Sequence, residues 1–381
     1  MLADATKALS WLDNAAEIRR GEGLGRELRP RQAIEPVIDL ASNDYLGLSR
    51  HPRVVEGAVC AARTWGVGST GSRLVTGSTE LHAQLEEELA SFCGVPAALV
   101  FSSGYTANLG ALTALSGPGS LVVSDAASHA SLVDACRLSR ARVVVTPHGD
   151  VAAVDAVLAA RSERRALVVT DSVVSVSGGL APLAAMHAVC RRRGAALLAD
   201  EAHAFGVCGP GGRGVLAAAG LAGAPDVVAT VSLSKSLGGQ GGAVLGSRPV
   251  IDHLINTARG FIFDTGLAPP AVGGALAALR VLRADPELPD RVLAAAAAIA
   301  AAAGAPPPAS AVISIILGPP QRAFDASADC LRQGVRVGCL RPPTVPPGTS
   351  RLRLTAHAAL TCQELARAAE VLAAVLAETA E

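Results

Sequence analysis

Lysine is almost absent from this sequence. The 381 residues include 33 lysines and arginines, and of these only Lys7 and Lys235 are lysines. Aromatic residues make up 3% of the chain, and 33 acidic residues balance the 33 basic ones. The balanced charge excludes a strong long-range field that would attract nucleic acid or an anionic membrane. Half of the residues are hydrophobic and 39 are glycine, which is typical of a compact α/β protein with many tight turns.

Paired cysteine motifs are also missing. The eight cysteines form no C-x-x-C pair and no His/Cys spacing typical of zinc sites, so we expect free thiols, no metal and a cytoplasmic location. Asp4 and Lys7 interrupt the apolar core that a secretory signal peptide would need. The uncharged run 292–320 is broken by Gly304 and by prolines 306–308, and therefore predicts a helix, a turn and a strand rather than a membrane span.

Lys235 follows an apolar, β-type run, with serines 232 and 234 before it and a glycine-rich turn after it. Arginine stays protonated and cannot act as an amine nucleophile. A desolvated lysine can lose its proton and form a Schiff base. The alternative interpretation is a surface lysine at the end of a strand, and the rest of the chain must decide between the two.

Short runs rich in valine and leucine alternate with helical patterns through the middle of the chain. Continuous apolar strands separated by helices predict an α/β fold with a mostly parallel sheet covered on both faces. A short glycine-rich turn precedes the last run, so we expect that strand to pair antiparallel. The predicted strands are 98–101, 121–124, 143–146, 166–170, 196–199, 227–231 and 243–245.

The pattern changes after residue 284. We predict a large domain over 41–284 and a small α+β domain over 285–381, with the N-terminal segment 1–40 packing against the small domain. The elements expected outside the large domain are a strand at 37–40, an alanine-rich helix, a strand at 311–317, a helix at 323–333, strands at 335–340 and 351–354, and a last helix at 362–377.

Residues 66–71 match the G-x-G-x-x-G pattern of dinucleotide-binding loops. That pattern indicates NAD binding only where it follows a strand and opens a helix. Here a helical pattern, 51–64, precedes it, so we interpret the match as coincidental.

Polar residues follow the predicted strands at their carboxyl ends, where open parallel sheets bind ligands. Each has an ordinary alternative as a helix cap, a turn residue or the partner of a buried backbone group. Together they supply what pyridoxal phosphate needs: a lysine for its aldehyde, a carboxylate for its pyridine nitrogen, and donors for its phosphate and phenolic oxygen. The candidates are Lys235, Asp200, Gly104 and Tyr105 with Ser232, His129 over the ring, His203 at the phenolic oxygen, and Ser175.

Five segments carry a family resemblance: SNDYLGL at 42–48, FSSGY at 101–105, DAASH at 125–129, DEAH at 200–203 and SLSKS at 232–236. With them the chain resembles the α-oxoamine synthases, a branch of the fold-type-I pyridoxal-phosphate enzymes, along essentially its whole length. The resemblance implies a mostly parallel seven-stranded sheet flanked by helices, a small α+β domain, and a homodimer with active sites at its interface. It also implies that Lys235, His129, Asp200 and His203 act in catalysis. Val174 and Ser177 depart from the family pattern, which often has phenylalanine and aspartate there.

Within this family, the stretch 341–355 resembles the branch that condenses L-alanine with a pimeloyl thioester of coenzyme A or a carrier protein, in biotin biosynthesis. Sister enzymes use glycine or serine, and one of them is the first alternative. A non-catalytic α/β binding protein is the second. The residues that the resemblance implies as substrate contacts are Arg26, Asn43, His129, Thr344 and Arg341, the last as an anchor for the α-carboxylate. It also implies that Thr70 and Thr265 reach toward the phosphate bound by a second subunit.

Overall fold

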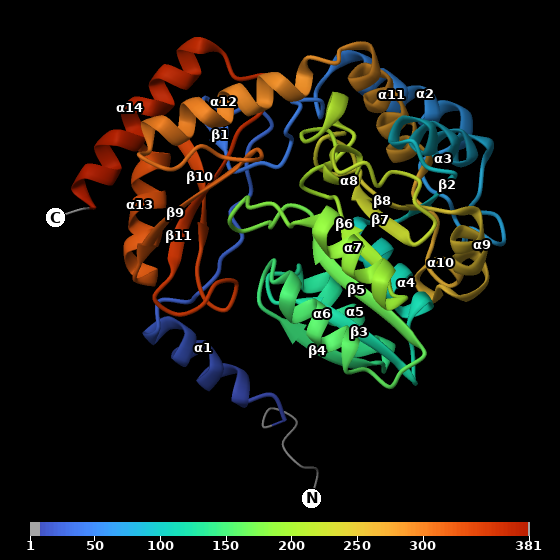
Figure 1. Ribbon diagram of the computed structural model, residues 1–381. Helices are drawn as coiled ribbons and strands as arrows, with labels where there is room; N and C mark the ends of the chain where they lie inside the picture. Colours follow the sequence, from blue (N-terminus) through green and yellow to red (C-terminus); the bar gives the residue numbers. More distant parts are fainter. Residues whose placement is uncertain (1–7, 380–381) are drawn as a thin grey trace, which may run out of the picture.

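Two β-sheets organise the chain, and Figure 1 shows them in separate parts of the molecule. The computed structural model describes residues 8–379, so Asp4 and Lys7 lie outside the described residues. The larger sheet has seven strands, as the sequence predicts. They are β2 (Ala97–Phe101), β3 (Ser120–Asp125), β4 (Arg142–Thr146), β5 (Arg165–Asp171), β6 (Ala196–Asp200), β7 (Val227–Ser232) and β8 (Gly242–Gly246).

The strand order in this sheet is β2-β8-β7-β6-β5-β3-β4. The strands from β7 to β4 pair in parallel. β8 is antiparallel to both β7 and β2, which confirms the expected antiparallel pairing. Because two antiparallel pairings restore the original direction, β2 runs the same way as β7. The carboxyl ends of six strands therefore lie at one edge of the sheet.

Helices cover both faces of the large sheet. Alternate residues of a strand point to opposite sides, so a continuously apolar strand makes both faces of the sheet apolar. Leu121 and Val123 of β3 belong to one buried cluster, and Val122 between them belongs to the other. One face is covered by α3 (Glu80–Cys93), α6 (Val151–Ala159), α7 (Leu183–Arg193), α8 (Val215–Ala218) and α11 (Pro269–Ala284). The other is covered by α4 (Gly104–Leu115), α5 (Ala130–Ser139), α9 (Arg248–Thr257) and α10 (Arg259–Ile262).

The smaller sheet has the strand order β1-β10-β11-β9. Its first strand comes from the N-terminal segment and pairs in parallel with β10. We propose 41–284 and 285–381 as the limits of the two domains. The strands are β1 (Ile38–Leu40), β9 (Val312–Gly318), β10 (Val335–Leu340) and β11 (Ser350–Thr355), and the remaining helices are α1 (Trp11–Gly21), α2 (Pro52–Trp65), α12 (Leu288–Ala302), α13 (Pro320–Arg332) and α14 (Cys362–Glu378).

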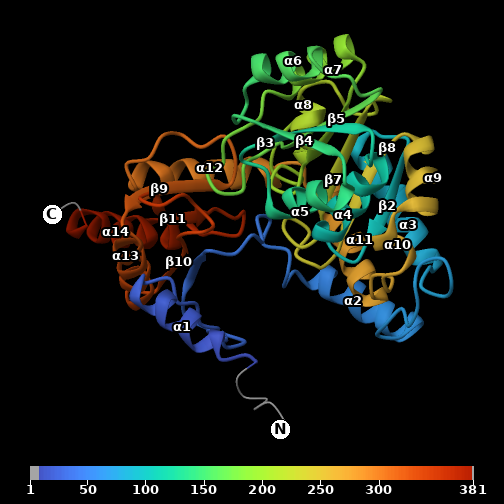
Figure 2. The same cartoon turned by 90° about the horizontal axis from the view of Figure 1, so that it is seen from below.

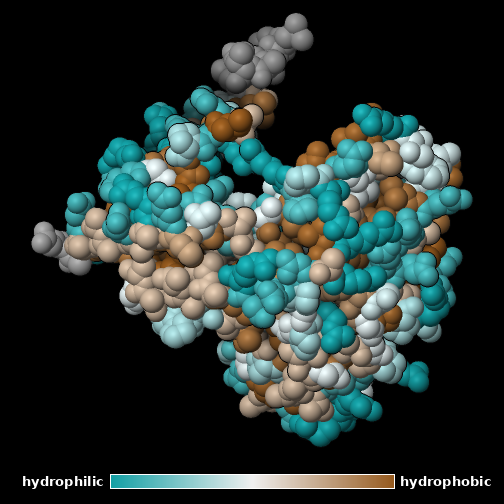
Figure 3. Space-filling model, turned by 90° about the horizontal axis from the view of Figure 1, so that it is seen from above, coloured by the Kyte–Doolittle hydropathy of each residue, from teal (hydrophilic) through white to brown (hydrophobic). Residues whose placement is uncertain are grey.

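The uncharged run 292–320 forms most of α12, a turn and β9, which confirms the prediction. Within residues 8–379, no helix combines the length and hydrophobicity required to span a bilayer. Seen from below, α1 lies beside α13 and β10 and away from the large sheet (Figure 2). The opposite view shows a hollow between the two parts of the molecule, with hydrophobic surface in its walls (Figure 3).

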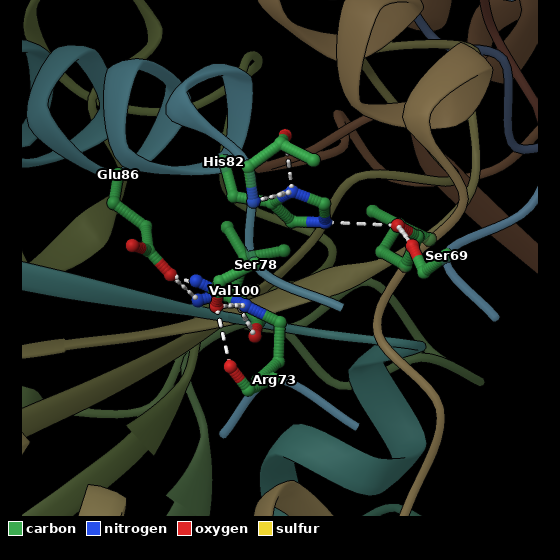
Figure 4. Close-up of polar contacts among 8 residues, drawn as sticks. Ser69, Arg73, Ser78, His82, Glu86 and Val100 are labelled. Carbon is green, nitrogen blue, oxygen red and sulfur yellow. Dashed lines mark hydrogen bonds and ion pairs between the residues drawn. The ribbon is translucent and has the colours of Figure 1, made fainter. Parts of the chain in front are cut away.

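The glycine-rich loop 66–79 joins two helices, α2 and α3, so residues 66–71 follow a helix instead of the strand that a dinucleotide-binding loop needs, and they do not open α3 directly. Buried polar contacts fix this loop (Figure 4). Arg73 donates to Val100 O at 3.0 Å and pairs with Glu86 at 2.9 Å. His82 Nε2 lies 2.8 Å from Leu267 O, which ties α3 to the loop before α11.

His82 makes stability depend on pH. Burial, helped by the Arg73 charge, lowers the pKa of His82 from 6.5 to about 4. The unfolded chain therefore binds a proton below pH 6.5 that the folded protein refuses, so stability is complete above pH 6.5 and falls as the pH drops toward 4. We expect a loss of about 2 kcal/mol between pH 6.5 and 5 from this residue. Urea unfolding of the native protein and of His82→Gln should show the steeper acid loss in the native protein, and equal slopes would contradict the assignment.

Candidate active site

The carboxyl edge of the large sheet brings the predicted residues together. Asp200 is the last residue of β6, and Thr230 is its register partner in the neighbouring strand β7. Lys235 follows β7 after two residues. Because the strands are parallel neighbours, residues far apart in the chain reach one side of the sheet.

Lys235 is a half-buried amine without a strong partner. Within residues 8–379 its Nζ makes no hydrogen bond and no ion pair. Burial lowers the pKa of Lys235 from its usual value, and the Arg353 charge adds to this, while Asp200 and Asp171 oppose it. A lysine of this kind can present an unprotonated amine to an aldehyde more readily than an exposed one.

Asp200 lies beside a second carboxyl group, Asp171, which is its register partner in β5. Asp200 is 7% exposed and accepts hydrogen bonds from Asn108 Nδ2 at 2.6 Å and from Ala202 N at 2.8 Å. Asp171 accepts one from His129 N at 3.1 Å. Burial, together with the Asp200 charge, raises the pKa of Asp171 well above its usual value. The pair therefore favours a neutral Asp171 beside Asp200.

His203 is held by a buried tyrosine. Tyr45 is fully buried, and its hydroxyl lies 2.6 Å from His203 Nδ1 and 3.1 Å from Asn43 Oδ1. Burial raises the pKa of Tyr45 to about 12, so the phenol stays protonated. Burial also lowers the pKa of His203 well below its usual value, and Lys235 and Arg353 add to this. A neutral His203 with a fixed ring results.

Arg353 of β11 completes this group from the small sheet. Its Nη1 donates to Asn43 Oδ1 at 3.1 Å, and its Nε donates to Ser175 O at 2.7 Å. Arg353 is only 9% exposed, and its charge acts on both Lys235 and His203. The small sheet thus contributes a buried cation to the edge of the large one.

His129 precedes α5 and caps it. Its Nδ1 lies 2.7 Å from Ser131 Oγ and accepts from Ser131 N at 3.2 Å. The ring meets that of Tyr105 edge-on, with centroids 6.3 Å apart. Protein atoms around the ring displace water and lower the pKa of His129; Lys235 adds to this, and Asp200 opposes it.

The predicted phosphate-binding residues lie at the start of α4. Gly104 and Tyr105 are the first two residues of this helix, and the first N–H groups of a helix have no acceptor within it. A Cβ on Gly104 would lie 3.3 Å from Cβ of Ser232, so glycine permits the close approach of α4 to the end of β7. The hydroxyl oxygens of Ser232, the last residue of β7, and of Ser234 in the turn after it lie 2.7 Å apart.

These residues fit pyridoxal phosphate. Lys235 could hold the aldehyde, Asp200 the pyridine nitrogen, and the start of α4 with Ser232 the phosphate. The amine without a partner and the close-packed glycine are what such a ligand requires. His203 and His129 would stand beside the ring.

Arg26 and Arg341 line a separate cavity between the N-terminal segment and the small sheet. Arg341 pairs with the carbonyl of Gly23 and donates to that of Gly25 at 3.1 Å, and its guanidinium lies over the Phe324 ring. These arginines border a cavity of about 660 Å³ that is lined by Ala16, Arg19, Arg20, Gly23, Gly25, Arg26, Glu27, Arg29, Gln321, Phe324, Cys339 and Arg341. Thr344 is exposed in the turn after β10.

Thr70 and Thr265 lie on neighbouring exposed loops. Thr265 forms an isolated bridge with Ser72, and Gly266 N donates to Gly71 O at 3.0 Å. Thr70 has a φ of 54°, an uncommon value for a residue with a branched side chain. The two loops therefore hold both threonines at the surface.

Four residues of this site carried no role in the sequence interpretation: Tyr45, Asn108, Asp171 and Arg353. Asn108 offers a signal, because its amide lies in a helix that has no charged residue and is mostly apolar after it. Arg353 alternates with leucines in its strand, a pattern that predicts a strand but not its neighbour across the molecule.

Comparison with known proteins shows the family of the chain. The family model for aminotransferase class I and II matches residues 35–372. An 8-amino-7-oxononanoate synthase from Mycolicibacterium smegmatis is 66% identical over 370 residues, which cover 97% of each chain. The chain belongs to the 8-amino-7-oxononanoate synthases of the aminotransferase class I and II family.

Solved structures of this wider family share the fold. Serine palmitoyltransferase from S. paucimobilis, solved with pyridoxal phosphate and myriocin bound, superimposes with a TM-score of 0.91 at 30% identity, covering 99% of this chain and 100% of that one. An 8-amino-7-oxononanoate synthase from Francisella tularensis gives a TM-score of 0.77 at 26% identity over 91% of this chain and 99% of that one. The mostly parallel α/β sheet predicted from the strand pattern and the fold-type-I architecture implied by the family resemblance are both confirmed.

Proposed function

We propose that this chain condenses L-alanine with a pimeloyl thioester, using pyridoxal phosphate, to give 8-amino-7-oxononanoate, CO2 and free thiol. The observation that carries the proposal is Lys235 at the end of β7 beside Asp200 at the end of β6. The family membership supports the same chemistry.

When bound, pyridoxal phosphate acts as an electron sink that stabilises negative charge on the α carbon of an attached amino acid. Asp200 would keep the pyridine nitrogen protonated, because its carboxylate is buried and already accepts two hydrogen bonds. Lys235 Nζ, with its lowered pKa, would take the proton from the α carbon and return one later. His203, fixed by Tyr45, would orient the phenolic oxygen.

Arg353 is our candidate for the α-carboxylate of L-alanine, in place of Arg341. Its guanidinium is the one that acts on Lys235 from the small sheet, and a planar fork suits a bidentate grip on a carboxylate. Arg341 borders the arginine-lined cavity instead, where it and Arg26 would attract the anionic acyl donor. Thr344 follows Arg341 in the same turn.

Replacing Arg353 by alanine should raise the KM for L-alanine by about 100-fold, because a charge-assisted bidentate pair is lost. The KM for the thioester should change little. Arg351→Ala is the matched control, since Arg351 lies two residues earlier in β11 and donates to Thr349 O at 3.0 Å. Steady-state kinetics with each substrate varied would decide, and an unchanged alanine KM in Arg353→Ala would remove Arg353 from this role.

A homodimer is also part of the proposal. The loops that carry Thr70 and Thr265 expose large hydrophobic side chains, among them Val67 at 81%, Val75 at 79% and Phe263 at 69%. Exposed apolar groups gathered around a functional loop are typical of a subunit interface. Analytical ultracentrifugation should find a dimer, and a monomer at micromolar concentration would contradict this part.

All eight cysteines are free thiols, which suits a cytoplasmic location.

A substrate panel tests the function. Purified protein loaded with pyridoxal phosphate should release thiol from pimeloyl-CoA or a pimeloyl carrier protein only when L-alanine is present. Faster turnover of glycine with acetyl- or succinyl-CoA would favour a sister α-oxoamine synthase. No turnover and no spectral response to amino acids would favour a non-catalytic protein.

A further inference from the structure

Asn108 is a buried amide at the centre of a hydrogen-bond network. It is 2% exposed and lies in the second turn of α4. Its Nδ2 donates to Asp200 Oδ2 at 2.6 Å and to Ser131 Oγ at 2.8 Å. Its Oδ1 accepts from Thr230 Oγ1 at 2.6 Å. One side chain therefore contacts β6, β7 and α5 at the same time.

The orientation of this amide follows from its partners. An amide turned by 180° would direct Oδ1 at the Asp200 carboxylate, which has only acceptors, and both groups would lose a hydrogen bond. Such a loss is costly in a buried site. The two protons of Nδ2 are therefore committed, one to Asp200 and one to Ser131.

Ser131 passes this orientation to His129. Since Ser131 Oγ accepts from Asn108, its own proton is free for His129 Nδ1, 2.7 Å away. The backbone N–H of Ser131 donates to the same nitrogen at 3.2 Å. Two donors thus face Nδ1, which must act as an acceptor, and in a neutral ring the proton then belongs on Nε2.

We propose that Asn108 and Ser131 are positioning residues that hold His129 in the Nε2–H tautomer, so that it serves as a hydrogen-bond donor and not as a base. The lowered pKa of His129 supports a neutral ring. The catalytic meaning rests on the proposed function: His129 would donate to an oxygen of the bound substrate, and proton transfer at the α carbon would be left to Lys235. The same amide holds Asp200, so ring and carboxylate are set together.

The tautomer can be measured in the cofactor-free protein by NMR of ¹⁵N-labelled histidine, with His129→Gln used to assign the signals. The native protein should show a protonated Nε2 and an unprotonated Nδ1. Ser131→Ala removes one of the two donors to Nδ1 of His129. It should lower the population ratio of the Nε2–H tautomer to the Nδ1–H tautomer about fivefold. Ser139→Ala, in the same helix, should leave the ratio unchanged, because Ser139 Oγ donates to Cys136 O at 2.7 Å and takes no part in the network. A proton on Nδ1 in the native protein, or an unchanged ratio in Ser131→Ala, would overturn the proposal.

Cofactor affinity gives a second readout. Titration with pyridoxal phosphate should find Ser131→Ala close to the native protein, because Asn108 still holds Asp200. Asn108→Ala should bind about tenfold more weakly, since Asp200 loses a donor. Equal losses in both variants would indicate a merely structural network and overturn the assignment. Failure of the native protein to bind the cofactor would contradict the proposed function. The histidine NMR measurement would still test the tautomer of His129, because it is made on the cofactor-free protein.

Discussion

Lys235→Ala should lose activity by about 10⁴-fold, because the chain then lacks both the amine that holds the cofactor and the base that moves the α proton. The purified variant should also lack the visible absorbance that lysine-linked pyridoxal phosphate gives. No other lysine lies among residues 8–379. Absorbance spectra and thiol release measure the two losses separately.

Lys235→Arg is the matched variant for this prediction. Arginine preserves the positive charge and most of the length, yet it cannot act as an amine nucleophile. We expect it to be as inactive as the alanine variant, with folding checked by circular dichroism. A native absorbance spectrum in either variant would place the cofactor link elsewhere.

Asp200→Asn should lower kcat by about 10³-fold and weaken pyridoxal phosphate binding. An amide cannot keep the pyridine nitrogen protonated, and removing one charge from a buried pair costs about 3–5 kcal/mol. Asparagine has a single acceptor oxygen, so it can keep the hydrogen bond from Ala202 N but not also the one from Asn108 Nδ2, which goes to the other oxygen of Asp200. Circular dichroism should check that the variant is folded. Cofactor titration and steady-state kinetics would measure both effects.

Asp171→Asn tests whether Asp171, the partner of Asp200, acts through a negative charge or only through its hydrogen bond. Since burial and Asp200 raise the pKa of Asp171 well above its usual value, an amide there resembles the neutral acid. We expect a loss of less than about tenfold, because the amide oxygen of the variant could still accept from His129 N. Equal losses in the Asp171 and Asp200 variants would mean that the charge is shared between the two carboxyls.

The sequence by itself determined the type and approximate bounds of the strands, because alternation and apolar runs are local properties. It also placed Asp200, Ser232 and Lys235 at strand ends, and the family segments gave them their proposed roles. Lys235 stood out because an almost lysine-free chain retains a lysine there.

Only the tertiary structure decided which strand ends are neighbours. β5, β6 and β7 are neighbours in the sheet, which sets Asp200 beside both Asp171 and Thr230. Elsewhere the order departs from the chain, because β8 lies between β2 and β7 and β3 lies between β5 and β4. The contact of Asn108 with Asp200 joins residues 92 positions apart, and that of Arg353 with Asn43 spans 310. No local pattern encodes such pairs, since they depend on how the two sheets pack. The sequence therefore identified the reactive lysine, and the packing of the sheets supplied the residues that set the charge and orientation of the groups around it.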